Sequence, residues 1–307
     1  MSDPDLRFAP ARPEDAPEAL EACAPIFESA PSLGDWWARR LRDPRGRVLL
    51  TRDASRPSQA GSGGPGRLVA LTIVDERPMV ALDGRAALTL PLADAPPGLD
   101  AALLPEVDAL ARRLGVGLLT ATIPAPDDGD PPCPAGYAPL QRLLVVSLPL
   151  DQPASAPPEG VAVAPHDGGD PAAEAEAADL SWRMMRREGV WPRLDGPAVA
   201  ALMAAPDSLW LLARDAASGR VVGVAETSPQ MGFYSMMAIA RSHWGTGLAD
   251  HMTREGLRAM AARGATHAFS LVRPGNAASL KLQARAGAAP TGAMMMFARK
   301  VPQPAMA

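Results

Sequence analysis

The chain has 307 residues, of which 47% are hydrophobic and 21% are charged, and its formal net charge is −4. Such a chain can bury the core of one large or two ordinary domains. The negative charge argues against nucleic acid as a partner, because a protein that neutralises phosphates needs a basic surface. The sequence has no apolar run long enough to span a bilayer and no apolar signal segment, so we expect a cytoplasmic protein without membrane contact. Its two cysteines, Cys23 and Cys133, match no metal or redox spacing, so we expect no metal cofactor.

The first half of the chain predicts alternating strands and helices. An apolar segment at 6–10 predicts an initial strand. The apolar runs 49–54 and 66–70 flank a loop rich in Ser, Gly and Pro, which predicts a β-hairpin. A helical pattern ends near Gly115, and the apolar run 118–123 predicts the next strand.

The same elements recur in the second half. Four pairs of short segments match in the same order and at nearly constant spacing: 49–54 with 211–216, 66–70 with 219–223, 109–115 with 259–264, and 135–139 with 286–290. We therefore expect an internal repeat. Each half predicts strand, helices, hairpin, strand, helix, strand, helix and strand. That order is typical of an α/β (α+β) fold with a mixed, mostly antiparallel sheet flanked by helices.

The segment 151–171 is rich in Pro, Gly and Asp and predicts a linker. Within it, the run 160–164 parallels the strand predicted at 6–10. We therefore predict two tandem domains, residues 1–150 and residues 151–307.

A glycine-rich turn in the second half joins a predicted strand, 236–239, to a predicted helix, 248–263. Such a turn exposes backbone N–H groups at a helix N-terminus, where the helix dipole favours an anion. The turn therefore predicts a phosphate or pyrophosphate site formed by Trp244, Gly245, Thr246, Gly247, Leu248 and Ala249.

The matching turn of the first half differs in its donors. The repeat aligns 244–249 with 94–99, where Pro96 and Pro97 have no backbone N–H. Asp94 would add a charge of the same sign as a phosphate. We therefore expect no pyrophosphate site in the first half.

Residues 161–299 resemble the GCN5-related N-acetyltransferase (GNAT) superfamily. The family's pyrophosphate loop, Arg/Gln-x-x-Gly-x-Gly/Ala, is matched at Gly247 and Ala249, with the frequent extra Gly at Gly245, and departs from the family at Trp244. A second motif, Asn-x-x-Ser-x-x-Leu-Tyr-x-x-x-Gly-Phe, is matched at Asn276, Ser279, Leu282 and Gly287. It departs at Gln283, where Tyr is usual, and at Ala288, where Phe is usual. The first half resembles the same fold more loosely, as a degenerate copy.

The resemblance implies acetyl-CoA or another acyl-CoA as co-substrate. In the family, the pantetheine arm lies between two splayed strands, so Met237, Ala238 and Ile239 would offer backbone hydrogen bonds to it. Asn276 and Ser279 lie where the family contacts the thiol end or the arm. Lys281 and Arg285 either meet a CoA phosphate or form a solvated helix face.

Acyl transfer to an amine needs a neutral amine, a polarised carbonyl and a proton for the leaving thiolate. Glu226, at the end of a predicted strand, is our candidate base; otherwise it faces solvent or forms an ion pair. Tyr234 is our candidate acid, because Gln283 cannot donate a proton usefully; otherwise it is an aromatic at a strand edge. His243 next to the turn is a weaker candidate base.

The helical region 172–205 is expected to bind the acceptor. It carries a set of large and cationic side chains that either forms a pocket or packs as helix core: Trp182, Arg183, Met184, Met185, Arg186, Arg187, Glu188 and Trp191. The run 294–296, all methionine, predicts core or the interface between the halves.

These residues together predict an acyl-CoA-dependent N-acyltransferase that acts on a small-molecule amine by direct transfer in a ternary complex, as a monomer or homodimer. Two alternatives stay open. One is a non-catalytic acyl-CoA-binding or scaffold protein, and the other is a biosynthetic enzyme of the same fold with a different acyl transfer.

Overall fold

The computed structural model describes residues 5–24, 31–42, 47–56, 66–80, 84–92, 95–126, 129–166, 168–185, 196–205 and 208–302. The first half contains β1 (Leu6–Pro10), α1 (Ala16–Ala22), α3 (Pro31–Leu41), β2 (Val48–Asp53), β3 (Arg67–Val80), β4 (Gly84–Pro91), α4 (Leu99–Arg113), β5 (Leu118–Ala125) and β6 (Ala138–Leu148). The second half contains β7 (Val161–His166), α5 (Pro171–Met185), α6 (Gly196–Met203), β8 (Leu209–Asp215), β9 (Val221–Ser228), β10 (Phe233–Ile239), α7 (Leu248–Ala262), β11 (Ala268–Val272), α8 (Ala277–Arg285) and β12 (Ala289–Lys300). None of these helices combines the length and apolar character needed to cross a bilayer.

The predicted internal repeat is present in the strands. β1, β2 and β3 form an antiparallel ladder in the first half, and β7, β8 and β9 form the corresponding ladder in the second. In each half a parallel pair follows, β4 with β5 and β10 with β11. The predicted fold class, a mixed and mostly antiparallel sheet flanked by helices, is confirmed.

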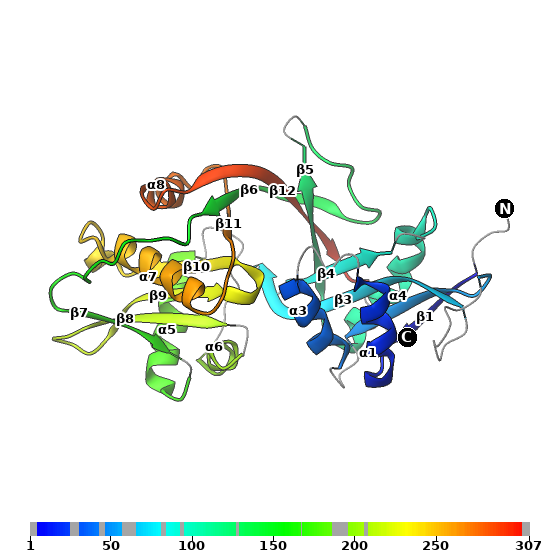
Figure 1. Ribbon diagram of the computed structural model, residues 1–307, viewed down its shortest axis with the longest axis horizontal. Helices are drawn as coiled ribbons and strands as arrows, with labels where there is room; N and C mark the ends of the chain where they lie inside the picture. Colours follow the sequence, from blue (N-terminus) through cyan, green and yellow to red (C-terminus); the bar gives the residue numbers. More distant parts are fainter. Residues whose placement is uncertain are drawn as a thin grey trace.

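The two halves share one sheet, which the sequence did not predict. Among the described residues its strands run in the order β1-β2-β3-β4-β5-β12-β6-β11-β10-β9-β8-β7. The last strand of each half is therefore exchanged: β12 lies between β5 and β6, and β6 lies between β12 and β11. Figure 1 shows these two long strands passing from one half of the molecule to the other. The division at residues 150 and 151 stays a prediction, and the hydrogen-bonded sheet crosses it.

Buried side chains fix the exchanged strand β12. Met295 lies opposite Ile123 of β5 and Arg142 of β6, and Met295 and Met296 are both buried. The run 294–296 therefore lies in the interface between the halves, as expected. Near the end of the strand, the Arg299 guanidinium pairs with the buried carboxylate of Asp108 on α4.

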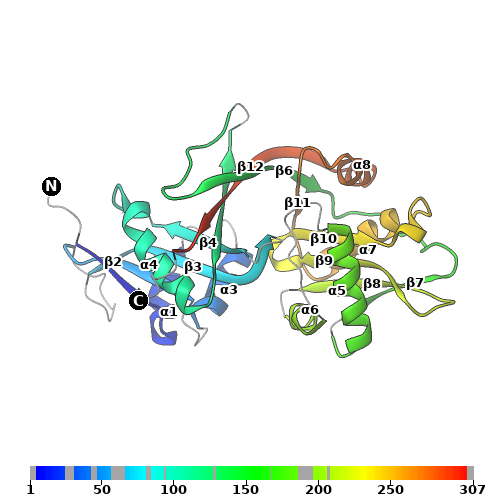
Figure 2. The same cartoon turned by 180° about the vertical axis from the view of Figure 1, so that it is seen from behind.

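Helices cover both faces of the second half of the sheet. Trp210, Met236 and Ala238 pack with α5 and α6 on one face. Tyr234 and Ile239 pack with α7 on the other. Figure 2 shows α5 lying across β8–β10 on the face away from α7. The side chains of β10 therefore point to one face of the sheet or the other, and this direction decides which of them can reach a ligand bound on a given face.

Candidate functional site

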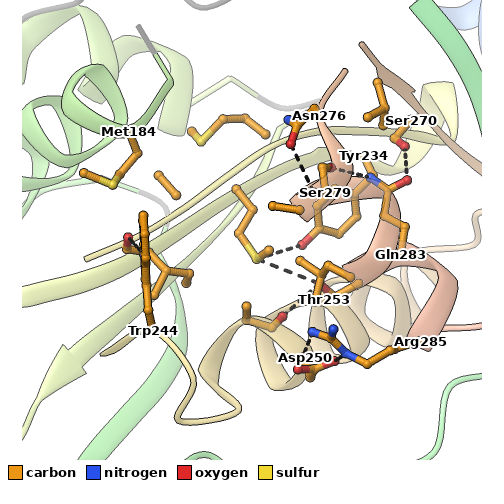
Figure 3. A pocket seen from close by; sticks show the side chains of 18 of the residues that line it. Met184, Tyr234, Trp244, Asp250, Thr253, Ser270, Asn276, Ser279, Gln283 and Arg285 are labelled. Atoms are coloured by element: carbon orange, nitrogen blue, oxygen red, sulfur yellow. Dashed lines mark hydrogen bonds and ion pairs between the residues drawn. The ribbon is translucent and has the colours of Figure 1, made fainter. Parts of the chain in front are cut away.

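Two parallel strands separate in the second half. β10 and β11 are in register only at Phe233 and Phe269, where the Phe269 N–H donates to the Gly232 carbonyl at 2.7 Å. Beyond this contact a cleft of about 840 Å³ opens, lined by both strands, the turn before α7, the start of α7 and α8. Figure 3 shows the side chains that line it. Separated strand edges offer backbone groups to an extended ligand.

The backbone of β10 turns alternate residues toward this cleft. The Ala240 N–H donates to the Val222 carbonyl of β9 at 2.8 Å. In an antiparallel ladder, alternate residues bond to the neighbouring strand, so the N–H and C=O of Ala238 also point to β9. Those of Met237 and Ile239 point to the cleft. The predicted ligand contacts of Met237 and Ile239 therefore fit this geometry, whereas the backbone groups of Ala238 face β9 and leave its contact without this support.

The glycine-rich turn forms the N-terminus of α7. Gly247 is the N-cap residue with φ +89°, and Gly245 has φ +79°. Both values lie in the left-handed region, which glycine adopts without strain. The first N–H groups of the helix, from Leu248 and Ala249 onward, have no carbonyl partner within it. The dipole at this end favours a negative group, so the turn fits a pyrophosphate.

Trp244 occupies the position where the family usually has Arg or Gln. Its side chain is 62% exposed, yet its indole Nε1 donates to the Ile239 carbonyl at 2.9 Å. The Arg241 guanidinium lies 5.8 Å from the ring centroid. Trp244 is therefore held at the edge of the cleft and engages a carbonyl that faces it. Met237 is left as the residue of β10 best placed to bond an extended ligand.

An ion pair joins the first turn of α7 to α8. Arg285 donates to both carboxylate oxygens of Asp250, at 2.6 Å and 2.9 Å, and the hydrogen bond to Asp250 raises the pKa of Arg285. Arg285 lines the cleft, whereas Lys281 does not. The two cations predicted as a pair therefore differ, since only Arg285 is near the anion-binding turn.

Three polar residues form the wall opposite β10. The Asn276 Oδ1 caps α8 by accepting from the Ser279 N–H at 3.1 Å. Gln283, at the family's usual Tyr position, donates to the Ser279 hydroxyl at 3.4 Å and accepts from the Ser270 hydroxyl at 2.8 Å. Asn276, Ser279 and Gln283 all line the cleft. A capping asparagine is a structural signal as well as a candidate ligand contact.

Tyr234 is buried, and it lies on β10 next to the point where this strand separates from β11. Its ring lies beside Gln283 and Ser279 in the cleft (Figure 3). Its hydroxyl lies 3.9 Å from the Met237 sulfur. Burial raises the pKa of Tyr234, so the hydroxyl stays protonated and can act as a donor.

Glu226 is also buried, with 2% of its surface exposed, so the alternative of a solvent-facing residue is wrong. It does not line the cleft. Its Oε2 accepts from the Ser235 hydroxyl at 2.8 Å, and its Oε1 accepts from the Ser208 hydroxyl at 3.3 Å. Ser235 does line the cleft. The sequence pattern gave no sign of Ser235, because a β-bulge between Tyr234 and Met236 directs it there.

Three of the remaining predicted residues, Arg183, Met184 and His243, line the cleft. His243 lines it and places Nε2 3.8 Å from the Asp215 carboxylate. Arg183 and Met184 line it from α5, and Arg183 pairs with Asp179 at 2.9 Å. Trp182 is half-buried, and the side chain of Met185 lies outside what the structure describes. The predicted acceptor residues Arg186, Arg187, Glu188 and Trp191 also lie outside the described residues.

The first half contributes to the cleft and lacks the donors of the turn. Leu143 and Leu148 of β6 line one wall, which sequence reasoning missed because it assigned β6 to the other domain. At the start of α4, Gly98 is the N-cap residue with φ +79°. It therefore corresponds to Gly247, one residue away from the predicted alignment. Pro96 and Pro97 precede it, so two N–H groups are missing from this turn.

The acetyltransferase (GNAT) family model matches residues 176–288. The chain is similar to a GCN5-related N-acetyltransferase from Sphaerobacter thermophilus (19% identity, 98% of both chains, TM-score 0.63) and to a tandem GNAT protein from the clavulanic acid biosynthesis pathway (16% identity, 98% of this chain and 100% of that one, TM-score 0.67). It is also similar to the N-myristoyltransferase of Saccharomyces cerevisiae (8% identity, 98% of this chain and 80% of that one, TM-score 0.64). At these identities the likenesses show the fold. No curated protein matches the sequence. The family model covers the elements around the cleft from β8 to α8, so residues 176–288 form an acetyltransferase (GNAT) domain, and the fold of both halves matches that of the tandem GNAT protein.

Proposed function

We propose that the protein transfers an acyl group, acetyl in the first instance, from acyl-CoA to a small-molecule amine, directly and within a ternary complex. The GNAT family uses acetyl-CoA or another acyl-CoA as co-substrate. The observation that carries the proposal is the separation of β10 from β11 directly before a helix N-terminus capped by Gly247. An acyl-CoA has an amide-bearing arm for the strand edge and a pyrophosphate for the helix.

Each part of the co-substrate has candidate partners in the cleft. The N–H groups of residues 245–249 would hold the pyrophosphate. The backbone groups of Met237, with the N–H of Ile239, would bond the arm. Asn276 and Ser279 would contact the thiol end or the arm from the opposite wall. We assign no such site to the first half, because Pro96 and Pro97 remove two donors there.

The acyl-CoA supplies a thioester as acyl donor, and the chain supplies the proton acceptor and donor. Glu226 is our proposed acceptor of the amine proton. Tyr234 is our proposed donor to the leaving thiolate, since its hydroxyl stays protonated. The Met237 N–H faces the cleft and would polarise the carbonyl. Holding both substrates in one cleft supplies much of the rate.

The proposal is tested by calorimetry with acetyl-CoA and with CoA, followed by thiol release against a panel of small-molecule amines. We expect one molecule of either ligand to bind per chain, and thiol to be released only when an accepted amine is present. Absence of binding by both ligands would overturn the assignment of the cleft.

A second function is favoured by Gln283, which stands where the family has Tyr. A protein that binds acyl-CoA without turnover would keep the Gly247 turn and tolerate this change. Binding of acetyl-CoA with no thiol release against any amine in the panel would favour this second function.

A further inference from the structure

The carboxylate of Glu226 is separated from the cleft by one hydroxyl. Glu226 is buried and does not line the cleft, whereas Ser235 lines it. The Ser235 Oγ lies 2.8 Å from the Glu226 Oε2. In this hydrogen bond the Ser235 hydroxyl donates to the carboxylate oxygen. The lone pairs of Ser235 Oγ then remain to accept a proton from the cleft.

The position of Ser235 depends on the β-bulge of β10. The register of β10 against β9 shifts between Tyr234 and Met236. Tyr234 packs toward α7 and Met236 packs toward α5, so Ser235 is the extra residue between two side chains on opposite faces. Bulges next to ligand sites commonly redirect a side chain in this way. Without the bulge, regular alternation would give Ser235 a different direction.

The second carboxylate oxygen of Glu226, Oε1, is positioned by two buried residues. The Trp210 indole Nε1 donates to the Ser208 hydroxyl at 2.8 Å, and this hydroxyl donates to the Glu226 Oε1 at 3.3 Å. Trp210 and Ser208 are both buried. The carboxylate is therefore oriented on one side by a fixed indole and serine, and its Oε2 is directed to Ser235. Such orientation of a base by another group is the arrangement that proton transfer requires.

We propose that Ser235 is a catalytic residue that relays the acceptor's proton to Glu226. This inference rests on the proposed acyl transfer. The amine nitrogen forms a bond to the acyl carbon and the carbon–sulfur bond breaks, with the electron pair leaving on sulfur. The nitrogen gives one proton to Ser235 Oγ while the Ser235 hydroxyl proton moves to Glu226 Oε2. Tyr234 gives its hydroxyl proton to the thiolate and regains one from solvent, and Glu226 returns one proton to solvent through Ser235, so the protons balance.

The test compares variants in acetyl-CoA turnover with an amine accepted in the panel. For Ser235→Ala we expect kcat to fall about 100-fold, the usual size of a general-base contribution, with KM for acetyl-CoA within about twofold. Ser235→Thr keeps a hydroxyl and should retain activity within about fivefold. The matched control is Thr227→Val, which removes a buried hydroxyl beside Glu226 that does not line the cleft. It should leave kcat unchanged.

Two further readouts separate a relay from a structural role. If both residues act on one proton path, the loss in Ser235→Ala combined with Glu226→Gln should equal that of Glu226→Gln alone rather than the product of the two. Calorimetry with CoA should give an unchanged affinity in each variant. A proton inventory measures kcat in mixtures of H₂O and D₂O. Because two protons move together in the relay, we expect the plot of wild-type kcat against the D₂O fraction to be curved.

Three results would each overturn the relay. They are a double variant whose loss of kcat equals the product of the two single losses, a wild-type rate that changes linearly with the D₂O fraction, and full activity in Ser235→Ala. The proposed function fails separately, by an absence of turnover in the wild type.

Discussion

The turns at the start of α7 and α4 share a backbone shape and differ in their donors. Each helix begins after a glycine in the left-handed region, Gly247 with φ +89° and Gly98 with φ +79°. In the second half, Gly245 and Thr246 precede this glycine and each has a backbone N–H, whereas Pro96 and Pro97 precede it in the first half and have none. The repeat thus preserves the geometry that begins a helix in both halves. Only the second half keeps the hydrogen-bond donors, so a conserved shape is not by itself a site.

The largest expected effect is that of Gly247→Pro on ligand binding. Proline removes one N–H from the turn and fixes φ near −65°, far from the observed +89°. We expect the affinity for CoA, measured by calorimetry, to fall at least about 100-fold.

Gly98→Pro is the matched control, because it introduces the same strain at the start of α4. It should lower stability but leave the affinity for CoA unchanged. If the two substitutions weakened CoA binding equally, the difference drawn between the two turns would be wrong.

The second effect concerns the ion pairs that tie helices in each half. Arg299 and Asp108 join β12 to α4, and their side chains are 12% and 8% exposed. Arg285 and Asp250 join α8 to α7, and theirs are 47% and 33% exposed. Removing one partner of a buried pair leaves an uncompensated charge, so Asp108→Ala should cost about 3–5 kcal/mol in urea unfolding. Asp250→Ala should cost no more than about 1 kcal/mol. Similar losses in both variants would mean that Arg299 finds another partner.

The elements themselves followed from local sequence patterns. The hairpins at 49–70 and 211–223 and the start of the helix at 248 depend on turn residues and periodicity, which neighbouring residues determine. The sequence alignment of the two turns was one residue away from the structural pairing of Gly98 with Gly247. It missed this pairing because matching residue types takes no account of the backbone φ angle.

The exchange of β6 and β12 could not be predicted in the same way. An apolar strand can pair with any edge of suitable register, and its partner is chosen by the packing of the whole sheet. For the same reason the sequence did not place Leu143 and Leu148 in the lining of the cleft. Ser235 was not predicted, because its direction depends on a β-bulge that regular strand alternation does not contain.

A third, smaller effect arises from a glycine that the two halves do not share. Gly223 of β9 corresponds in the repeat to Ala70 of β3. A Cβ at Gly223 would lie 2.6 Å from the Met252 sulfur and 2.9 Å from the Ala213 Cβ, so α7 packs closely on the sheet there. Gly223→Ala should destabilise the fold by about 1–3 kcal/mol through overpacking, measured by urea unfolding. Ala70→Gly is the reciprocal change and should cost only about 1 kcal/mol, since it removes one methyl group from a buried site. Equal losses would mean that the two halves pack alike.

The smallest expected effect is a pH dependence confined to the second half. The segment that follows β6 crosses α7, where Ser155 Oγ lies 2.9 Å from the His251 Nδ1. The segment that follows β12 packs on α4 through Val301, without a histidine. Burial lowers the pKa of His251; the nearby Glu255 carboxylate raises it by a smaller amount, and the Arg258 charge lowers it. A histidine kept neutral by folding binds protons more readily when unfolded, so its contribution is fully present above its unfolded pKa of about 6.5 and is lost as pH falls below it. The melting temperature of the wild type should therefore fall more steeply below about pH 6.5 than that of His251→Gln. Parallel pH profiles of the two proteins would show that His251 ionises alike in the folded and unfolded states.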